Sequence, residues 1–237
     1  MTAVTIETTH TRPDQLADLA DFYRSRSGDD VSLFDIWETG GARGDSVTPS
    51  THSPAYRTWM LELLNGELTR AGSRRLVSLG SGNAAVESHL VAAGVEVLAV
   101  DAMAEAVAMS TAKGVRSVEA DVTTWTPTDP WPVAYLDGLL GHLYDARTAT
   151  LPILAHVRSW LGVDGRGILV ASNDATRDGS RVQAAPGVTG FHWLAVDYLR
   201  EQAQLAGFDD VSVNSYVYRR PLSGDRVRSV IVARFGY

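Results

Sequence analysis

The chain of 237 residues contains no cysteine, which excludes both a disulfide framework and a thiolate metal site. Positive charge is also scarce, with 21 Lys and Arg against 28 Asp and Glu and a net charge of −7. Nucleic acids and anionic membranes bind clustered Lys and Arg, so we expect neither as a partner. The sequence has no apolar run of membrane length and no segment that resembles a signal peptide. We therefore expect a cytoplasmic protein that acts on a small molecule.

The most informative stretch is a glycine turn between two short apolar runs. Residues 76–79 are followed at once by Gly80 and Gly82, which predicts a buried parallel strand that ends in a tight turn before a helix. The glycines permit positive φ and leave no Cβ between the backbone and a ligand. Asp101 closes the next apolar run, 97–100, where a carboxylate can accept hydrogen bonds from both hydroxyls of a ribose. The pattern predicts a nucleotide site.

The rest of the chain predicts alternating strands and helices. Further strands are expected at 118–120, 133–136 and 168–171, and the last two segments, 211–219 and 227–235, have the alternation of a hairpin. A dinucleotide dehydrogenase more often continues with parallel units instead. Apolar spacing predicts helices at 13–26, 54–71, 102–114, 147–161 and 194–206.

The connection 28–54 is long and rich in Gly, Ser, Thr and Pro, yet it carries Phe34, Ile36 and Trp37. Its aromatic residues favour an ordered lid over a disordered linker. We expect residues 1–72 to form an N-terminal helical cap and lid, and residues 73–237 to form the ligand-binding domain.

A third acid, Asp121, closes the strand at 118–120 and is followed by Val122. With the glycine turn, Asp101 and the terminal hairpin, it makes the segment 74–237 resemble the class I S-adenosylmethionine-dependent methyltransferases. The resemblance implies a Rossmann-like α/β fold, with a seven-stranded, mainly parallel sheet and a C-terminal antiparallel hairpin. It also implies S-adenosylmethionine as cofactor and S-adenosylhomocysteine as product. The cofactor-binding residues that it implies are Gly80, Gly82, Asp101, Ala102, Asp121, Val122 and Asp137.

Two positions depart from the family pattern. Ser78 replaces the acid that usually stands two residues before the first glycine, which weakens the expected hold on the ammonium group of the cofactor. Ala84 replaces the usual third glycine by another small residue.

Ligands of open α/β sheets bind beyond the carboxyl ends of the strands, which makes Asp137 and His142 the expected catalytic residues. His192 is a second candidate base, and Tyr23, Trp37 and Tyr56 are candidates for an aromatic cap over a cation. Structural roles, such as a helix cap or ion pair for Asp137, remain alternatives.

Two hypotheses give Asp137 a sharper role. With Asn173 and Asp174 it loosely resembles the magnesium site of catechol O-methyltransferases, although the pair stands in reverse order and we expect no metal ion. With Glu38 from the lid it resembles the carboxylate clamp of guanidinoacetate N-methyltransferase. Glu38 is therefore a third catalytic candidate.

We predict a methyltransferase of specialised metabolism that acts on a small polar metabolite and methylates a nitrogen, of an amine or a guanidine, rather than an oxygen. An NAD-dependent oxidoreductase is the alternative enzyme, because Gly80, Gly82, Ala85 and Asp101 also satisfy the dinucleotide pattern. A non-catalytic ligand-binding module is a third reading, supported by Ser78 and Ala84. Monomer and homodimer both remain open.

Overall fold

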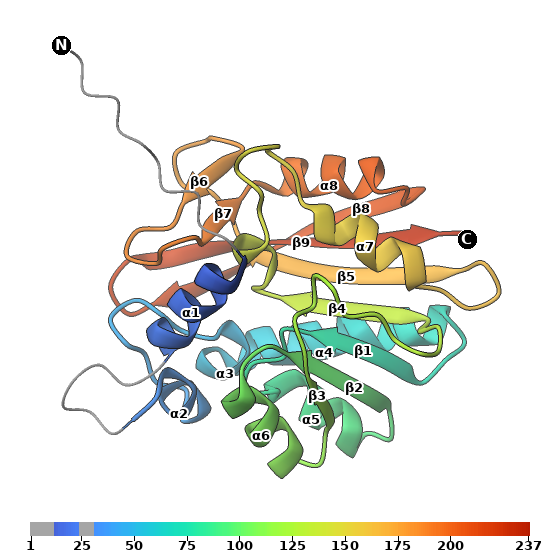
Figure 1. Ribbon diagram of the computed structural model, residues 1–237, viewed down its shortest axis with the longest axis horizontal. Coiled ribbons are helices and arrows are strands. Elements are labelled where there is room, and N and C mark those ends of the chain that lie inside the picture. Colours follow the sequence, from blue (N-terminus) through green and yellow to red (C-terminus); the bar gives the residue numbers. More distant parts are fainter. Residues whose placement is uncertain (1–11, 24–30) are drawn as a thin grey trace.

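Seven strands form one sheet in the order β3-β2-β1-β4-β5-β9-β8 in the computed structural model, which describes residues 12–23 and 31–237 (Figure 1). The strands are β1 (Arg75–Leu79), β2 (Glu96–Asp101), β3 (Arg116–Glu119), β4 (Val133–Asp137), β5 (Gly167–Asp174), β8 (Asp210–Arg220) and β9 (Gly224–Phe235). The first five run parallel, whereas β9 lies antiparallel between β5 and β8. The predicted sheet and hairpin are confirmed.

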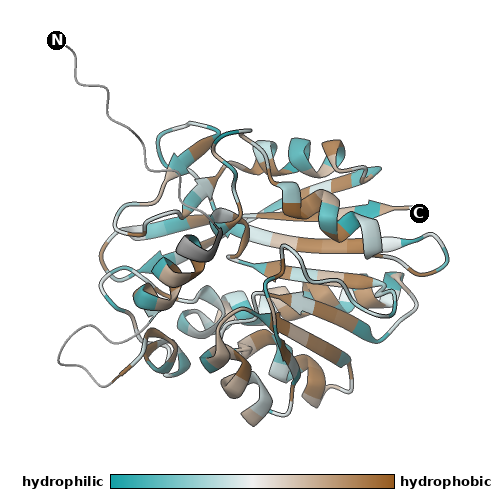
Figure 2. Ribbon diagram, in the orientation of Figure 1, coloured by the Kyte–Doolittle hydropathy of each residue, from teal (hydrophilic) through white to brown (hydrophobic). Residues whose placement is uncertain are grey.

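Side chains alternate between the two faces of the sheet, and each face has its own helices. Val77 and Leu79 of β1 pack in the core shared with α7 (Pro152–Trp160) and α8 (Val196–Leu205). Leu76 packs in the core on the other face, with α4 (Pro54–Arg70) and α5 (Ala85–Ala92). Figure 2 shows apolar residues concentrated in the central strands. Because the side-chain period is two, Ser78 lies on the face of α4 and α5.

A third layer lies over the carboxyl ends of the parallel strands. It consists of α1 (Arg12–Tyr23), α2 (Leu33–Glu38) and α3 (Pro49–His52), at the left of Figure 1. Phe34 and Trp37 of α2 are buried, and Tyr23 of α1 stacks on Phe34 with ring centroids 4.8 Å apart. The aromatic residues of the predicted lid therefore pack as an ordered layer.

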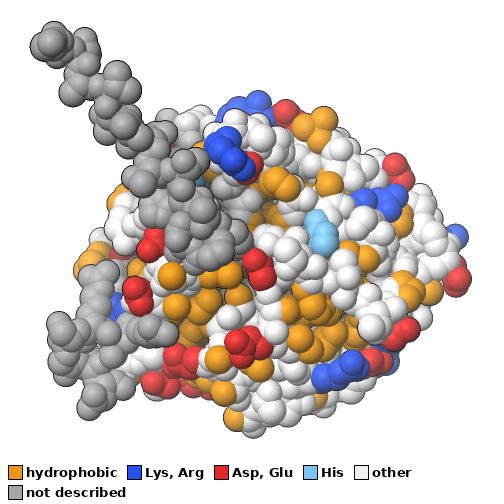
Figure 3. All heavy atoms as spheres, viewed as in Figure 1, with side chains coloured by type: hydrophobic (Ala, Val, Ile, Leu, Met, Phe, Trp, Pro, Cys, Tyr) orange, Lys and Arg blue, Asp and Glu red, His pale blue; other side chains and the backbone are white. Residues whose placement is uncertain are grey.

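The smaller elements complete the chain. They are α6 (Ala104–Ala112), the 3-10 helix η1 (Leu140–His142), and β6 (Val182–Ala184) paired with β7 (His192–Leu194) in a separate two-stranded sheet. No helix of the described residues is long and apolar enough to cross a membrane. On the face shown in Figure 3, the Lys and Arg side chains lie in separate small groups among Asp and Glu.

Several predicted boundaries differ from the structure. The helix expected at 147–161 begins only at Pro152, because Asp145 and Thr150 exchange backbone hydrogen bonds and Ala149 takes a φ of 53°. The helix expected at 13–26 is described through Tyr23, and its last three residues lie outside the described residues.

The connection predicted as irregular, 28–54, contains α2 and α3, and residues 24–30 lie outside the described residues. The N-terminal helices thus continue into α4, which packs in the core of the sheet. The domain boundary between residues 72 and 73 stays a prediction.

Candidate active site

A cavity of about 680 Å³ lies at the carboxyl ends of the parallel strands, under α1 and α2. Its walls include the glycine turn after β1, the ends of β2, β4 and β5, and the β8–β9 hairpin. This is the edge where open α/β sheets bind their ligands. Its volume is that of a small-molecule site, which spans roughly 300–1,000 Å³.

The glycine turn adopts the backbone that its sequence predicts. Gly80 has a φ of +69°, a conformation that favours glycine, and a Cβ there would lie 2.9 Å from Cδ1 of Leu139, so any larger residue would also displace that side chain. Ala84, at the N-cap of α5, also has left-handed geometry, with a φ of 51°. Ala84 therefore keeps the conformation for which a third glycine is usual.

Asp101 ties this turn to the end of β2. Its Oδ2 accepts the backbone N–H of Gly82 and its Oδ1 accepts that of Met103, both at 2.9 Å. The side chain is buried at the cavity wall, and burial raises the pKa of its carboxyl group. Asp101 thus holds the turn in shape and lines the cavity wall.

The predicted cofactor residues converge on the cavity with one exception. Asp121 does not line it, and its Oδ1 instead accepts the backbone N–H of Thr123 at 3.0 Å. Trp125, which follows the same turn, packs against Trp160 away from the cavity. The residues that do line it are Gly80, Gly82, Asp101, Ala102, Val122 and Asp137.

Asp137 lies in the cavity wall, but both of its oxygens have partners. Oδ1 accepts the hydroxyl of Tyr56 at 3.1 Å and pairs with Arg228, while Oδ2 accepts the hydroxyl of Tyr135 at 3.1 Å. Ser172 also donates to Oδ1. The negative charge of Asp137 is therefore compensated by the guanidinium of Arg228 on β9.

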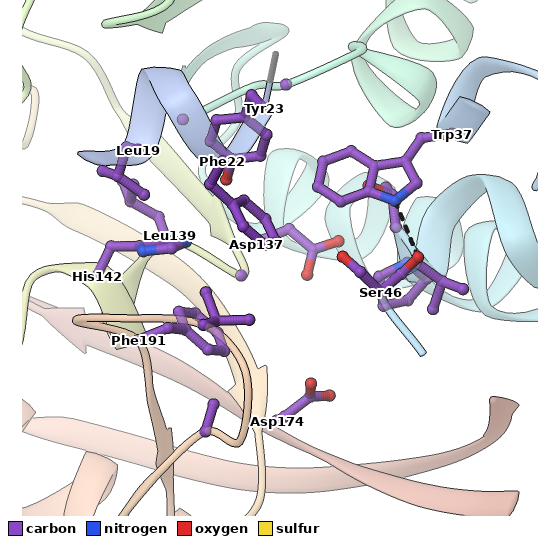
Figure 4. A pocket seen from close by; sticks show the side chains of 18 of the residues that line it. Leu19, Phe22, Tyr23, Trp37, Ser46, Asp137, Leu139, His142, Asp174 and Phe191 are labelled. Atoms are coloured by element: carbon purple, nitrogen blue, oxygen red, sulfur yellow. Dashed lines mark hydrogen bonds between the residues drawn. The ribbon is translucent and has the colours of Figure 1, made fainter. Parts of the chain in front are cut away.

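Arg228 joins Asp137 to Asp174, whose Oδ1 lies 3.3 Å from the guanidinium. Asp174 also accepts the hydroxyl of Tyr218 at 2.9 Å and pairs with Arg220. Figure 4 shows Asp137 near the centre of the view, with Leu139 and His142 on one side, Trp37 and Ser46 on the other, and Asp174 below it.

The side-chain oxygens of Asp137, Asn173 and Asp174, the residues of the magnesium hypothesis, already have protein partners. Asn173 is fully buried, its Oδ1 accepts the backbone N–H of Gly141 at 2.9 Å, and its Nδ2 donates to the carbonyl oxygen of His192 at 2.9 Å. Asp137 and Asp174 face a guanidinium, and the described residues include no group of three acidic or imidazole ligands.

Glu38, the second carboxylate of the predicted clamp, has partners other than a ligand. Its carboxylate pairs with Lys113 and accepts Nδ2 of Asn83 at 3.1 Å, and Glu38 is not part of the cavity wall. Glu38 instead links α2 to the glycine turn, because Lys113 also donates to the carbonyl oxygen of Asn83 at 2.6 Å.

Of the two predicted histidines, one lines the cavity and the other does not. His142 lines the cavity, with its ring centroid 4.5 Å from that of Phe191. His192 is not in the cavity wall, its ring packs on Tyr144, and burial lowers its pKa.

Of the three aromatic candidates, Tyr23 and Trp37 line the cavity, with ring centroids 5.6 Å apart. Tyr56 lies beneath Asp137 and is fully buried. The structure therefore brings two of the three rings to the cavity.

Comparison with known proteins adds the family. The chain is 40% identical over 224 residues to a tabtoxin biosynthesis enzyme of Pseudomonas amygdali pv. tabaci, covering 92% of this chain and 88% of that protein. No protein-family model matches the chain.

In structure the chain is similar to the 1,6-didemethyltoxoflavin-N1-methyltransferase of Burkholderia thailandensis with bound S-adenosylhomocysteine. The TM-score is 0.66 at 17% identity, and the match covers 98% of this chain and 93% of that one. It is also similar to the magnesium protoporphyrin IX methyltransferase of Synechocystis PCC 6803 with bound S-adenosylmethionine, with a TM-score of 0.60, 15% identity and coverage of 94% and 99%.

The chain belongs to the family of the tabtoxin biosynthesis enzyme and has the class I S-adenosylmethionine-dependent methyltransferase fold. The fold and the family resemblance predicted from the sequence are confirmed. The enzyme class and cofactor expected from the sequence are those of the two structural neighbours, which hold S-adenosylmethionine or S-adenosylhomocysteine.

Among the cavity residues that the sequence pattern does not mark is a buried acid, Glu87. Glu87, in the first turn of α5, is 3% exposed, lines the cavity and accepts the hydroxyl of Ser78 at 2.6 Å. Burial raises the pKa of its carboxyl group from 4.5 to about 7. A Glu in a first helical turn is ordinarily explained by the helix dipole, so only the contact with Ser78 singles it out.

Proposed function

We propose that the protein transfers the methyl group of S-adenosylmethionine to a nitrogen of a small polar metabolite, in specialised metabolism. The observation that carries the proposal is the convergence of the glycine turn, Asp101 and Val122 on one cavity. The methionyl, ribose and adenine parts of the cofactor would contact these residues in that order. S-adenosylmethionine supplies an electrophilic methyl group when it is bound, and the protein needs chiefly to position the acceptor.

Two features favour this reading over the alternatives. The antiparallel β9 between β5 and β8 differs from the parallel 3-2-1-4-5-6 order typical of dinucleotide dehydrogenases. The departures that suggested a non-catalytic module are accommodated, because Ala84 keeps the left-handed turn and Ser78 contacts an acid on α5.

The charges around the acceptor half of the cavity favour an amine over a guanidine. Asp137 and Asp174 already bind the guanidinium of Arg228, so a second guanidinium would compete with a buried ion pair. Both oxygens of Asp137 are already engaged by Tyr56, Tyr135 and Arg228, so Asp137 is poorly placed to serve as the general base that a hydroxyl acceptor needs. A neutral amine needs only an aligned lone pair, and His142 is placed in the wall to take up its proton.

The comparisons support the same chemistry. One structural neighbour is an N1-methyltransferase that holds its small-molecule substrate, and the sequence relative acts in tabtoxin biosynthesis. The cytoplasmic location and the absence of a nucleic-acid partner stay predictions from the sequence. The oligomeric state stays open.

Ligand-induced stabilisation tests the cofactor. We expect S-adenosylmethionine and S-adenosylhomocysteine, but not NAD, to raise the unfolding temperature, since a ligand at 100 times its dissociation constant adds about 2.7 kcal/mol. Stabilisation by NAD alone would overturn the proposal.

Isotope-labelled S-adenosylmethionine tests the acceptor atom. The protein is incubated with a panel of small amines and of hydroxyl compounds matched in shape, and methylated products are identified by mass spectrometry. We expect labelled products from amines. Methylation confined to the hydroxyl compounds would contradict the nitrogen assignment and leave the methyltransferase assignment intact.

A further inference from the structure

A buried glutamate lies directly below the glycine turn. Ser78 on β1 stands two residues before Gly80, on the sheet face covered by α5. Glu87 of α5 reaches down to it, with Oε1 2.6 Å from the Ser78 hydroxyl. The Glu87 carboxylate of α5 thus lies next to Ser78, the position of β1 at which the family pattern has an acid.

Within the described part of the chain, this carboxylate has no paired cation. Glu87 is 3% exposed, and among the described residues no Lys, Arg or His nitrogen is paired with it, whereas Arg228 pairs with both Asp137 and Asp174. A buried carboxylate without a counter-charge is costly, and the Ser78 hydroxyl and the backbone N–H of Glu87 itself offset only part of that cost. The cavity next to Glu87 therefore favours a cationic group of a ligand.

The groups that face Glu87 do not supply a counter-charge of its own. Ser78 of β1 donates a hydrogen bond, which lowers the pKa of the Glu87 carboxyl, whereas the charge of Asp137 at the end of β4 raises it. Tyr135 of β4 donates its hydroxyl to Asp137 and is neutral. Lys113, which lowers the pKa of the Glu87 carboxyl weakly, already pairs with Glu38. A dinucleotide pyrophosphate would meet uncompensated negative charge here.

We propose that Glu87 binds the α-ammonium group of the methionyl part of S-adenosylmethionine, with Ser78 as the residue that orients it. The assignment rests on the proposed function, and it names which residue of this chain holds the charged end of the cofactor. An ammonium has three N–H donors and supplies the positive charge that the buried carboxylate lacks.

Paired ligands and variants test this contact. Dissociation constants are measured by calorimetry at pH 8 for S-adenosylhomocysteine and for its desamino analogue, in which hydrogen replaces the ammonium. We expect Glu87→Gln to weaken S-adenosylhomocysteine by roughly 10- to 100-fold, the range of a charge-assisted hydrogen bond. The desamino analogue should bind the wild type and the variant with the same affinity.

Two further variants guard the conclusion. Glu96→Gln, at an exposed glutamate that pairs with Arg75 outside the cavity, should bind both ligands as the wild type does. Ser78→Ala keeps Glu87 but removes its hydrogen bond, so we expect a smaller loss that again requires the ammonium. This second variant also serves if Glu87→Gln fails to fold.

Three results would count against the inference. Equal losses for both ligands would give Glu87 a role in the shape of the cavity only, and undiminished affinity for S-adenosylhomocysteine would remove it from the site. A wild-type protein that binds neither S-adenosyl compound would instead contradict the proposed function, and this outcome is read before any variant is compared.

Discussion

Replacing Glu87 by glutamine should stabilise the ligand-free protein at alkaline pH. Burial raises the pKa of this carboxyl group from 4.5 in an exposed chain to about 7 in the folded protein. The folded state thus binds the proton more tightly than the unfolded state. Stability associated with Glu87 is fully present below about pH 4.5 and is lost as the pH rises through about 7.

The size of the effect follows from the two pKa values. At about 1.4 kcal/mol per pH unit, the full titration corresponds to about 3 kcal/mol of unfolding free energy, most of it between pH 5 and pH 8. Glutamine cannot ionise, so the difference between Glu87→Gln and the wild type should grow by about 2–3 kcal/mol in favour of the variant over this range.

Urea unfolding of both proteins at pH 5, 6, 7 and 8, without ligand, measures this difference. Other titrating groups are common to both proteins and cancel, as does any constant cost of burying the amide. Parallel pH profiles for the two proteins would refute the reasoning, because they would mean that Glu87 titrates alike in the folded and unfolded states. A gain at high pH together with weaker cofactor binding would show that the site sacrifices stability for binding.

Three other predictions concern the predicted site residues. Asp101→Ala should weaken S-adenosylhomocysteine binding by about 1.5–3 kcal/mol in calorimetry, since a charged acceptor is lost, and unchanged affinity in a folded variant would remove Asp101 from the site. Asp137→Asn should lower the unfolding free energy by about 3 kcal/mol in urea, because Arg228 stays buried with less compensating charge; a wild-type urea midpoint would contradict this. Glu38→Gln should speed proteolytic cleavage within 31–53 in the absence of ligand, because it weakens the link between α2 and the glycine turn, and a cleavage rate equal to that of the wild type would argue against this link.

Most strands can be predicted from the sequence, because a buried parallel strand is a short apolar run that ends at a turn residue. The run 76–79, followed by Gly80, is such a case, and β1 ends at Leu79. The first and last residues of helices are harder to predict. Residues 147–151 have side chains compatible with a helix, yet the backbone hydrogen bonds between Asp145 and Thr150 and the left-handed φ of Ala149 hold a turn there until Pro152 begins α7. In the connection 28–54, abundant Gly and Ser hide two short helices, of which α2 buries Phe34 and Trp37.

The candidate site was predictable where a residue stands at the end of a strand. Asp101 and Asp137 reach the cavity wall for that reason alone. Partners across the sheet were not predictable, because Arg228 lies 91 residues from Asp137 and only the antiparallel register of β9 brings them together. Glu87 was missed because a single sequence does not show which strand residue a helix side chain contacts.

The two halves of the cavity come from different stretches of the chain. The residues to which we assign the cofactor, the glycine turn, Asp101 and Val122, come from 80–122, whereas Asp45, Phe191 and Ser223 belong to the lid, the β6–β7 segment and the hairpin turn. Lid and hairpin are joined directly, since Asp45 accepts the backbone N–H groups of Leu222 and Ser223 at 3.0 and 3.1 Å. Evolution can therefore remodel the acceptor entrance by insertions and exchanges in these loops while the cofactor half is inherited unchanged. Homologues that keep Gly80 and Asp101 but differ in these loops are expected to have diverged in the compound they methylate.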